Sequence, residues 1–245
     1  MNETKRMAGR RVLITGAASG IGKASAQCLA GHGAALALLD RDGDALAQVA
    51  GELGAHAETL DLMDERAIVR AVAASGAAMG GIDAVVNVAG IGEVAPLGET
   101  TLESWNRVVA INLTAPFLVC REALPLLRAS EDGAIVNISS GQGLLPSVPG
   151  MGSYCASKGG LVTWTKAMAL ELAPIRVNAI CPGVVDTPLL PDGMREAARS
   201  ATSPYALRRV GDADEIAQAV LYLASAQSSF VTGVALAVDG GRSYH

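Results

Sequence analysis

Short apolar runs alternate with amphipathic stretches from one end of this 245-residue chain to the other. The apolar runs have the length of strands and the amphipathic stretches the length of helices, which predicts a parallel sheet with helices on both faces. The length fits one large α/β domain better than two small ones. We therefore expect a doubly wound parallel sheet of about seven strands in a single domain, residues 1–245. The expected strands lie at 12–15, 34–39, 56–60, 82–86, 134–138, 175–180 and 235–238.

A glycine-rich turn joins the first expected strand to a helix that begins near Ser19. Glycines in such a turn let the backbone approach a diphosphate, and the helix N-terminus adds the positive end of its dipole. The glycine spacing is GxxxGxG and not GxGxxG. The prediction of dinucleotide binding therefore depends on the position of the turn, directly after the first strand. The residues expected to bind the diphosphate of a dinucleotide are Gly16, Ser19, Gly20, Ile21 and Gly22.

Acidic residues follow the second and third expected strands. A carboxylate at Asp40 can accept both ribose hydroxyls of an adenosine and repels a 2′-phosphate, which favours NAD over NADP. Arg41 is a competing feature, because its guanidinium could turn towards such a phosphate. Asp61, followed by Leu62, could meet the adenine amine. The alternatives are that Asp40 caps the helix that follows it, and that Asp61 or Asp64 caps the next helix.

Tyr154 and Lys158 lie four residues apart in an expected helix that runs to about Leu172, so both side chains should share one face. A free Tyr titrates near pH 10, and a neighbouring positive charge favours its phenolate. One Lys and one positively charged ring in a water-poor cleft could bring the pKa of Tyr154 to about 7. Tyr154 would then be a general acid and base near neutral pH. The alternative is an ordinary pair on a helix surface.

The longest expected helix, Leu102–Arg128, contains Pro116 and Pro125, and proline bends or ends a helix. Asn112 lies in its apolar centre, where a buried Asn needs hydrogen-bond partners. It could make a structural hydrogen bond, or it could hold a water if the helix is distorted there. After the fourth expected strand, small residues would let a cofactor ribose lie against the backbone; the residues expected there are Asn87, Ala89 and Gly90.

The composition argues against several classes of protein. A net charge of −5 and a pI near 5.2 argue against a nucleic-acid-binding surface, which needs a basic patch. The cysteines are widely spaced, as in proteins of a reducing compartment, and the histidines share no ligand spacing, so we expect no metal site. The first eleven residues lack the apolar centre of a signal peptide, and no apolar run approaches the length of a membrane span. We expect a soluble cytoplasmic protein.

Taken together and in order, the motifs of this chain resemble those of the short-chain dehydrogenase/reductase family in its single-domain form. The resemblance extends over nearly the whole chain and implies a Rossmann-like fold. The matching stretches are 15–22 (TGxxxGIG), 87–90 (NNAG, with Val88 in place of the second Asn), Asn112, 135–140, Tyr154 with Lys158 (YxxxK), 182–187 (PGxxxT) and 232–241.

The serine departs from the pattern of the family. In many relatives the catalytic Ser lies thirteen residues before the Tyr, whereas Ser140 lies fourteen and Ser139 fifteen residues before Tyr154. Gly143 completes the S-x-x-G of the family when Ser140 is the reference. We therefore choose Ser140 as the catalytic serine and place one extra residue in the loop 144–151, with Ser139 as the alternative.

The resemblance implies hydride transfer between the nicotinamide of NAD(H) and a secondary alcohol or ketone. Tyr154 would exchange the hydroxyl proton, and Lys158 would lower its pKa and hold the nicotinamide ribose. Ser140 would orient the substrate oxygen, and Asn112 would position a water. The residues implied to lie over the nicotinamide are Pro182, Gly183, Val185 and Thr187.

The segment at about 188–209 contains several chain breakers and is expected to form a mobile flap over the carboxyl edge of the sheet. Arg195 or Arg199 on this flap could bind a carboxylate, and the role of Glu93 is open. Most wall residues are apolar, which suggests a small to medium, largely uncharged substrate. The expected wall residues are Glu93, Gln142, Leu144, Leu145, Met151, Leu189, Leu190 and Met194. The expected substrate contacts are Ser140, Gln142, Tyr154 and Leu189.

Two other functions are compatible with the same motifs. An NADPH-dependent 3-oxoacyl-carrier-protein reductase resembles the chain closely, but Asp40 disfavours NADPH. A non-catalytic dinucleotide sensor would be expected to lose Tyr154 or Lys158, and both are present. Relatives are mostly homotetramers that pair through their long helices and C-terminal strand. The apolar faces of 105–127 and 161–172 are compatible with this, and we expect a homotetramer.

Overall fold

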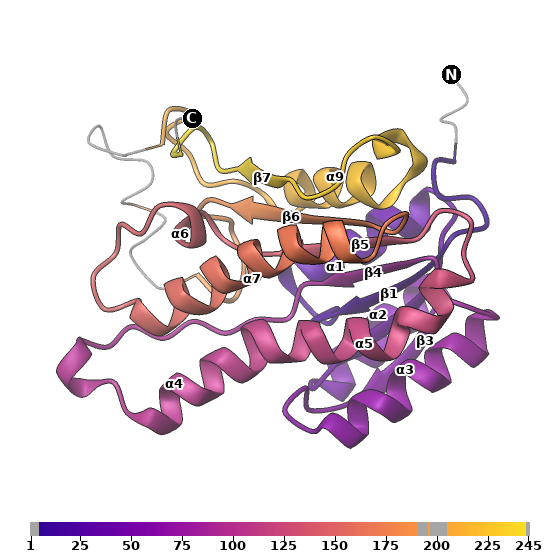
Figure 1. The fold of residues 1–245 in the computed structure, drawn as a ribbon, viewed down its shortest axis with the longest axis horizontal. Helices are drawn as coiled ribbons and strands as arrows, with labels where there is room; N and C mark the ends of the chain where they lie inside the picture. Colours follow the sequence, from indigo (N-terminus) through magenta and orange to yellow (C-terminus); the bar gives the residue numbers. More distant parts are fainter. Residues whose placement is uncertain (1–4, 191–195, 197–204, 244–245) are drawn as a thin grey trace.

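The computed structural model describes residues 5–190, 196 and 205–243. The strands are β1 (Arg11–Thr15), β2 (Ala35–Asp40), β3 (His56–Thr59), β4 (Ala84–Asn87), β5 (Ala134–Ile138), β6 (Arg176–Pro182) and β7 (Ala235–Val238). They form one parallel sheet in the order β3-β2-β1-β4-β5-β6-β7 (Figure 1). This confirms the expected doubly wound architecture, in which the strand order reverses between β1 and β4.

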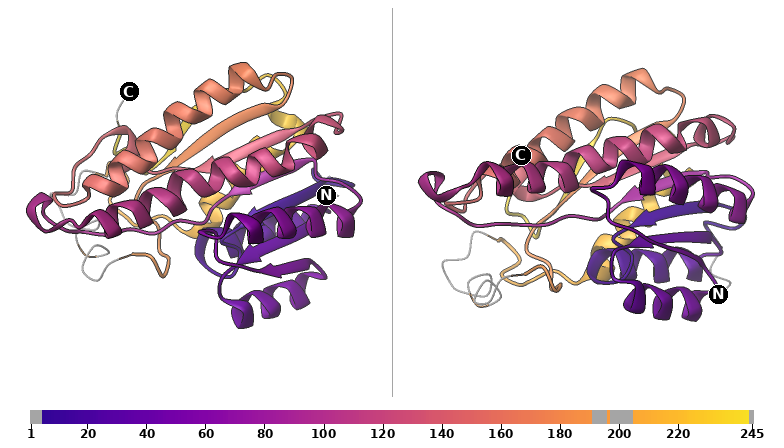
Figure 2. Two further views of the ribbon diagram at one scale, coloured as in Figure 1. Left: turned by 60° about the horizontal axis from the view of Figure 1, so that its bottom comes forward. Right: turned by 90° about the horizontal axis from the view of Figure 1, so that it is seen from below.

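Helices cover both faces of the sheet, as the turned views in Figure 2 show. On β1, Val12 and Ile14 pack into the core on one face and Leu13 into the core on the other, as expected for strands buried on both sides. One face is covered by α1 (Gly20–Gly31), α2 (Gly43–Leu53) and α9 (Ala213–Ala224). The other face is covered by α3 (Glu65–Met79), α5 (Ala115–Arg128) and α7 (Gly152–Glu171). Short helical segments are η1 (Leu97–Glu99), α6 (Gly141–Leu144) and η3 (Ala226–Ser228).

Aspartates cap two of these helices and decide between the alternatives left open by the sequence. The carboxylate of Asp42 accepts from the Ala45 N–H at the start of α2, so Asp42 and not Asp40 caps that helix. The carboxylate of Asp64 accepts from the first-turn N–H groups of α3, so Asp64 and not Asp61 caps it. Both helices thereby satisfy N–H groups that have no partner within the helix.

The long helix of 102–128 is continuous but irregular. It consists of α4 (Leu102–Val109), the π-helical turn η2 (Ala110–Thr114) and α5. The irregularity is centred on Asn112, and Pro116 is its physical cause, because proline has no N–H to donate to the carbonyl four residues earlier. Pro116 therefore cannot donate to the carbonyl of Asn112. Pro125 lies within α5 without ending it.

The same continuous helix corrects an expectation about length. The helix from Leu102 to Arg128 has 27 residues and is long and apolar enough to cross a membrane by length and composition alone, with a mean hydropathy of 1.3 over an 18-residue window. No apolar run was expected to approach that length. In the fold, α5 packs against α3 and buries Val119, Ala123 and Leu127 against the sheet.

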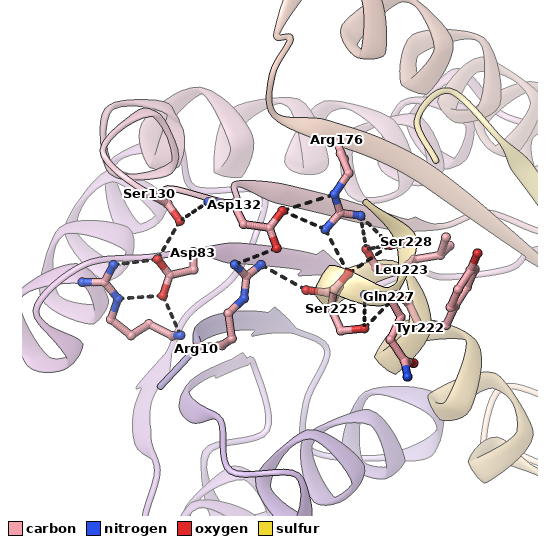
Figure 3. Close-up of polar contacts among 12 residues, drawn as sticks. Arg10, Asp83, Ser130, Asp132, Arg176, Tyr222, Leu223, Ser225, Gln227 and Ser228 are labelled. Carbon is pink, nitrogen blue, oxygen red and sulfur yellow. Dashed lines mark hydrogen bonds and ion pairs between the residues drawn. The ribbon is translucent and has the colours of Figure 1, made fainter. Parts of the chain in front are cut away.

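A network of ion pairs joins the amino ends of the strands, at the edge opposite the carboxyl ends (Figure 3). The guanidinium of Arg11 contacts both carboxylate oxygens of Asp83, at 2.8 and 2.6 Å, and the Ser130 hydroxyl donates to the same carboxylate at 2.7 Å. Asp132 pairs with Arg10 at 3.1 Å and with the buried Arg176 at 3.4 Å. The network therefore ties β1, β4 and β6 to the segment that precedes β5.

Asp83 makes the stability of this fold sensitive to acid. Burial alone would raise the pKa of Asp83, but the hydrogen bonds from Arg11 and Ser130 outweigh it and lower that pKa to about 2. Because the pKa is lower in the folded protein than in the unfolded chain, the contribution is complete above about pH 4 and is lost as the pH falls towards 2. Asp83→Asn is expected to lower the free energy of unfolding at neutral pH by about 2 kcal/mol.

Denaturant titrations at a series of pH values measure this effect. The difference between wild type and Asp83→Asn should shrink steadily below pH 4, whereas Glu103→Gln, at an exposed position in α4, should follow the wild type throughout. A difference for Asp83→Asn that stays constant down to pH 2 would show that the ionised carboxylate is not what stabilises the fold.

Candidate active site

Two adjoining cavities open at the carboxyl edge of the sheet, beside the point between β1 and β4 where the strand order reverses. This is the position at which open α/β sheets bind ligands. The first, here called the Asp40 cavity, has a volume of about 490 Å³, and the second, the Tyr154 cavity, about 390 Å³. Both are bordered by Ile21, Val88, Gly90, Thr187 and Leu189.

The glycine-rich turn after β1 forms one wall of the Asp40 cavity. Gly16 has a φ of +69°, and a Cβ atom there would lie 2.8 Å from the backbone nitrogen of Ala89. Ser19 is the N-cap of α1, and its side chain makes no capping hydrogen bond. The helix N-terminus therefore faces the cavity with N–H groups and a hydroxyl that an anion can use. All five residues predicted to bind a diphosphate line this cavity: Gly16, Ser19, Gly20, Ile21 and Gly22.

The lining of the Asp40 cavity includes Asp40, which favours NAD, and Arg41, which could favour NADP. The two carboxylate oxygens of Asp40 accept from the N–H groups of Ala18 and Asp42, at 3.0 and 3.1 Å, which fixes the carboxylate in place. Arg41 lines the same cavity, as do Asp61 and Leu62. An anchored carboxylate and a flanking guanidinium thus face the same space.

Ser140 and Tyr154 meet in the Tyr154 cavity. A hydrogen bond joins their side chains, and the Ser140 hydroxyl also accepts from the Gln142 N–H at 3.1 Å, where α6 begins. Ser139 also lines this cavity, but its hydroxyl donates to the main-chain carbonyl of Lys158 at 2.8 Å. Of the two serines, Ser140 is therefore the one that shares a hydrogen bond with Tyr154.

The sequence-based expectation of a phenol with a pKa near 7 is not met by the protein residues themselves. Burial raises the pKa of Tyr154, and the hydrogen bond with Ser140 offsets this only in part. Lys158 is buried as well, which lowers its pKa to about 8, and its ammonium donates to the Ile138 carbonyl at 2.7 Å. A lowered pKa of Tyr154 would therefore depend on the positive charge of a bound nicotinamide ring.

Lys158 and Asn112 come together at Gly90. A Cβ atom on Gly90 would lie 3.2 Å from the Lys158 ammonium and 3.3 Å from the Asn112 side-chain oxygen. The amide of Asn112 accepts from the Ile91 N–H and donates to the Ile91 carbonyl, both at 2.9 Å, and donates to Ser157 at 3.1 Å. Its side chain thus makes structural hydrogen bonds, and it lines neither cavity. The water that Asn112 is expected to position stays a prediction.

The side chain of Asn87, an expected cofactor contact, is engaged within the protein. Its amide donates to the Asn137 side chain at 2.8 Å and to the Cys120 sulfur at 3.3 Å, and it is 2% exposed. Because Asn87 is the last residue of β4, its side chain points under the helix layer and lies outside both cavities. Its neighbours Ala89 and Gly90 do line the Asp40 cavity.

The other predicted residues divide as follows. Leu144 and Leu145 lie outside the lining of the Tyr154 cavity. Arg195, Arg199 and Met194 fall outside the described residues, as does most of the segment expected as a flap. The predicted residues that do line the Tyr154 cavity are Glu93, Ser140, Gln142, Met151, Tyr154, Lys158, Pro182, Gly183, Val185, Thr187, Leu189 and Leu190.

Several wall residues were missed by reasoning from the sequence. Tyr205 and Arg242 line the Tyr154 cavity, and Arg107 and Ile111 line the Asp40 cavity. Arg242 could have been found, because it follows the glycine turn after β7. Every loop that follows a strand of a parallel sheet reaches the same edge.

Comparisons with known proteins agree with this geometry. A family model described as enoyl-(acyl carrier protein) reductase matches residues 16–243. The chain is 38% identical to a 2,5-dichloro-2,5-cyclohexadiene-1,4-diol dehydrogenase of Sphingobium indicum, over 97% of this chain and 98% of that one. It is 39% identical to a cyclopentanol dehydrogenase of Comamonas testosteroni, over 94% and 95%. A crystal structure of a 3-ketoacyl-(acyl-carrier-protein) reductase from Brucella melitensis complexed with NADH superposes with a TM-score of 0.90, at 37% identity over 96% and 98%.

Proposed function

This chain belongs to the short-chain dehydrogenase/reductase family, as an oxidoreductase of CH–OH groups, and we propose that it transfers a hydride between NAD(H) and a secondary alcohol or ketone. One observation carries the proposal. Ser140 and Tyr154, joined by a hydrogen bond, lie in a largely apolar cavity that adjoins the glycine-lined cavity after β1.

The residues of the Tyr154 cavity support distinct roles. In alcohol oxidation the Tyr154 oxygen takes the hydroxyl proton, and in ketone reduction it returns that proton. Ser140 holds the substrate oxygen beside the phenol. The buried Lys158 ammonium, fixed by the Ile138 carbonyl, contributes positive charge and a hydrogen-bond donor for the nicotinamide ribose. The dinucleotide, when bound, supplies the hydride chemistry, and the protein supplies position and electrostatics.

The walls of the Tyr154 cavity support a compact, largely apolar alcohol. Val94, Val148, Met151, Leu189 and Leu190 provide apolar surface around Ser140 and Tyr154. Relatives at 38 and 39% identity are dehydrogenases of a cyclohexadiene diol and of cyclopentanol. Cyclic secondary alcohols are therefore the first compounds to test.

The experiment measures the dissociation constants of NADH and NADPH side by side by fluorescence titration. Hydrogen bonds to a charged group are worth about 1.5–3 kcal/mol, so Asp40 should give NADH an advantage of at least about tenfold. Asp40→Asn preserves the shape and removes the charge, and it should reduce this advantage. Arg41→Gln should leave NADH affinity unchanged and weaken any binding of NADPH.

Turnover of cyclopentanol and cyclohexanol with the preferred oxidised cofactor completes the experiment. Production of the reduced cofactor supports the alcohol dehydrogenase. If NADPH binds more tightly and a 3-oxoacyl thioester is reduced in preference to these ketones, the second candidate, a 3-oxoacyl-carrier-protein reductase, replaces it. That candidate is favoured by the Brucella melitensis relative. If neither dinucleotide binds, the proposed hydride transfer is wrong.

We further propose a homotetramer in the cytoplasm. Exposed large apolar side chains on α4, α5 and α7 support an assembly through these helices, because interfaces bury apolar surface of this kind. The residues concerned are Leu102, Trp105, Phe117 and Leu170.

A further inference from the structure

Arg242 is a buried guanidinium in the wall of the Tyr154 cavity. It follows the turn after β7 and is 5% exposed. One of its nitrogens, Nη2, donates to the Leu145 carbonyl and to the Ser147 hydroxyl, which holds the side chain against the loop after α6. The other terminal nitrogen, Nη1, has no hydrogen-bond acceptor among the described residues.

Within the described chain, no carboxylate forms an ion pair with Arg242. Asp239 is the nearest in sequence, but its oxygens accept from the backbone N–H groups of 241, 242 and 243 at 3.0, 3.2 and 2.8 Å. Glu93, a carboxylate in the wall of the same cavity, pairs with Arg107 at 3.4 Å. The equally buried Arg176 does have a carboxylate partner, Asp132.

A buried charge without a counterion is unfavourable unless something else compensates it. Neutral acceptors compensate Arg242 only in part, because a carbonyl and a hydroxyl carry no net charge. The positive charge of Arg242 at the cavity wall therefore favours the binding of an anion in this cavity. This distinguishes Arg242 from the ion pairs at the amino edge of the sheet, which are complete within the protein.

Arg242 lines the same cavity as Ser140 and Tyr154, and its Nη1 lies beside the residue that follows Ser140. A Cβ atom on Gly141, the residue after Ser140, would lie 2.9 Å from Nη1 of Arg242. The charge of Arg242 also acts on two other groups of this region, opposing the effect of burial on the pKa of Cys155, beside Tyr154, and on that of Tyr205. Because Arg242, Ser140 and Tyr154 line one cavity, one molecule in it can contact all three.

We propose that Arg242 binds the carboxylate of a hydroxycarboxylic acid while Ser140 and Tyr154 engage its hydroxyl group. The inference rests on the proposed alcohol dehydrogenase and names its substrate class as a compact hydroxy acid with an apolar body. A carboxylate fits better than a phosphate, because one partly engaged guanidinium can satisfy a planar anion whereas a phosphate dianion requires more donors. The apolar wall residues accommodate the body of the molecule.

The test compares 3- and 4-hydroxycyclohexanecarboxylate with their carboxamides, which have nearly the same shape and no charge. Wild type should show a kcat/KM for the acid about ten- to hundredfold above that for the amide, as expected for a hydrogen bond between charged groups. Arg242→Gln should reduce this ratio towards one, chiefly through KM, and Arg242→Lys should keep part of it. Ser147→Ala is the matched control, since it removes a neighbour of the guanidinium and keeps the charge, and it should retain the ratio.

A purely structural role for Arg242 gives a different pattern. In that case Arg242→Gln and Ser147→Ala would lower kcat/KM for acid and amide alike and leave their ratio unchanged, which would overturn the inference. A wild type that shows no preference for the acid, but oxidises cyclohexanol with NAD⁺, would overturn it too and leave the proposed function standing.

Cyclohexanecarboxylate separates the two hypotheses when no alcohol is oxidised, because it has no hydroxyl group to react. Calorimetric titration into wild type and Arg242→Gln, both with NAD⁺, should show binding that the variant loses. That result would sustain the anion site even if the proposed reaction failed. Equal binding to both proteins, or none to either, would overturn the anion site.

Discussion

Tyr154→Phe is expected to lower kcat for alcohol oxidation by about 10²–10⁴-fold, the range in which a positioned general acid or base contributes to catalysis. The substitution removes one hydroxyl group from the Tyr154 cavity and leaves the ring in place. Ser140 keeps its hydrogen bond with the Gln142 N–H, so the start of α6 should remain ordered. The loss should therefore appear in the chemical step, with the affinity for NADH close to that of wild type.

Steady-state kinetics with the best alcohol of the panel and a fluorescence titration of NADH measure the two quantities separately. Tyr222→Phe is the matched control, because it makes the same chemical change at an exposed position on α9 and should leave kcat unchanged. Retained turnover in Tyr154→Phe would remove Tyr154 from the mechanism. A parallel loss of NADH affinity would show that the phenol acts on cofactor binding and not on the chemical step alone.

Gly22→Ala is expected to lower both the free energy of unfolding and the affinity for NADH. A Cβ atom at position 22 would lie 1.9 Å from the carbonyl oxygen of Gly16 and 2.7 Å from its carbon. Both atoms belong to the backbone of the turn, so the clash is relieved only if the turn moves. Overpacking of this kind costs about 1–3 kcal/mol. Loss of one charge-assisted hydrogen bond to the diphosphate, about 1.5–3 kcal/mol, should weaken NADH binding at least about tenfold.

The same helix supplies the control for this experiment. Gly31 is the last residue of α1, and a Cβ atom there would meet nothing within 4 Å. Gly31→Ala should be neutral or should stabilise the protein by about 0.5–1 kcal/mol, since Ala restricts the unfolded chain and suits a helix better. If Gly22→Ala has the same free energy of unfolding and the same affinity for NADH as wild type, the close approach of the turn to α1 does not require glycine at position 22.

The arrangement of strands and helices could be predicted from the sequence because the central strands are continuous apolar runs, buried on both faces, that alternate with helical stretches. The fifth and seventh strands, Ala134–Ile138 and Ala235–Val238, begin and end where they were predicted. The choice of capping residues could not be predicted in the same way. Asp40 and Asp42, or Asp61 and Asp64, are equally suitable caps by residue type, and only the path of the backbone selects one of each pair.

The candidate site was predictable wherever a residue follows directly from the end of a strand or from helical spacing. The direction of the Asn87 side chain could not be predicted, because the last residue of a strand can face either layer, and this side chain pairs with Asn137 beneath α5. Arg242 was missed because its environment is built by the loop after α6, nearly a hundred residues earlier. The pKa of Tyr154 could not be predicted from its spacing to Lys158, because burial acts on both groups and depends on the whole fold.

The anchoring of Lys158 has a consequence for how this site can change by mutation. Its ammonium is held by the main-chain carbonyl of Ile138, and its own carbonyl accepts from Ser139, so strand and helix are cross-linked through backbone atoms. No side-chain replacement at position 138 deletes the acceptor that positions the lysine. Wall residues of the Tyr154 cavity such as Gln142, Leu189 and Arg242 can therefore be exchanged in laboratory evolution without re-optimising the lysine, and new specificities should be reachable through single substitutions at these positions.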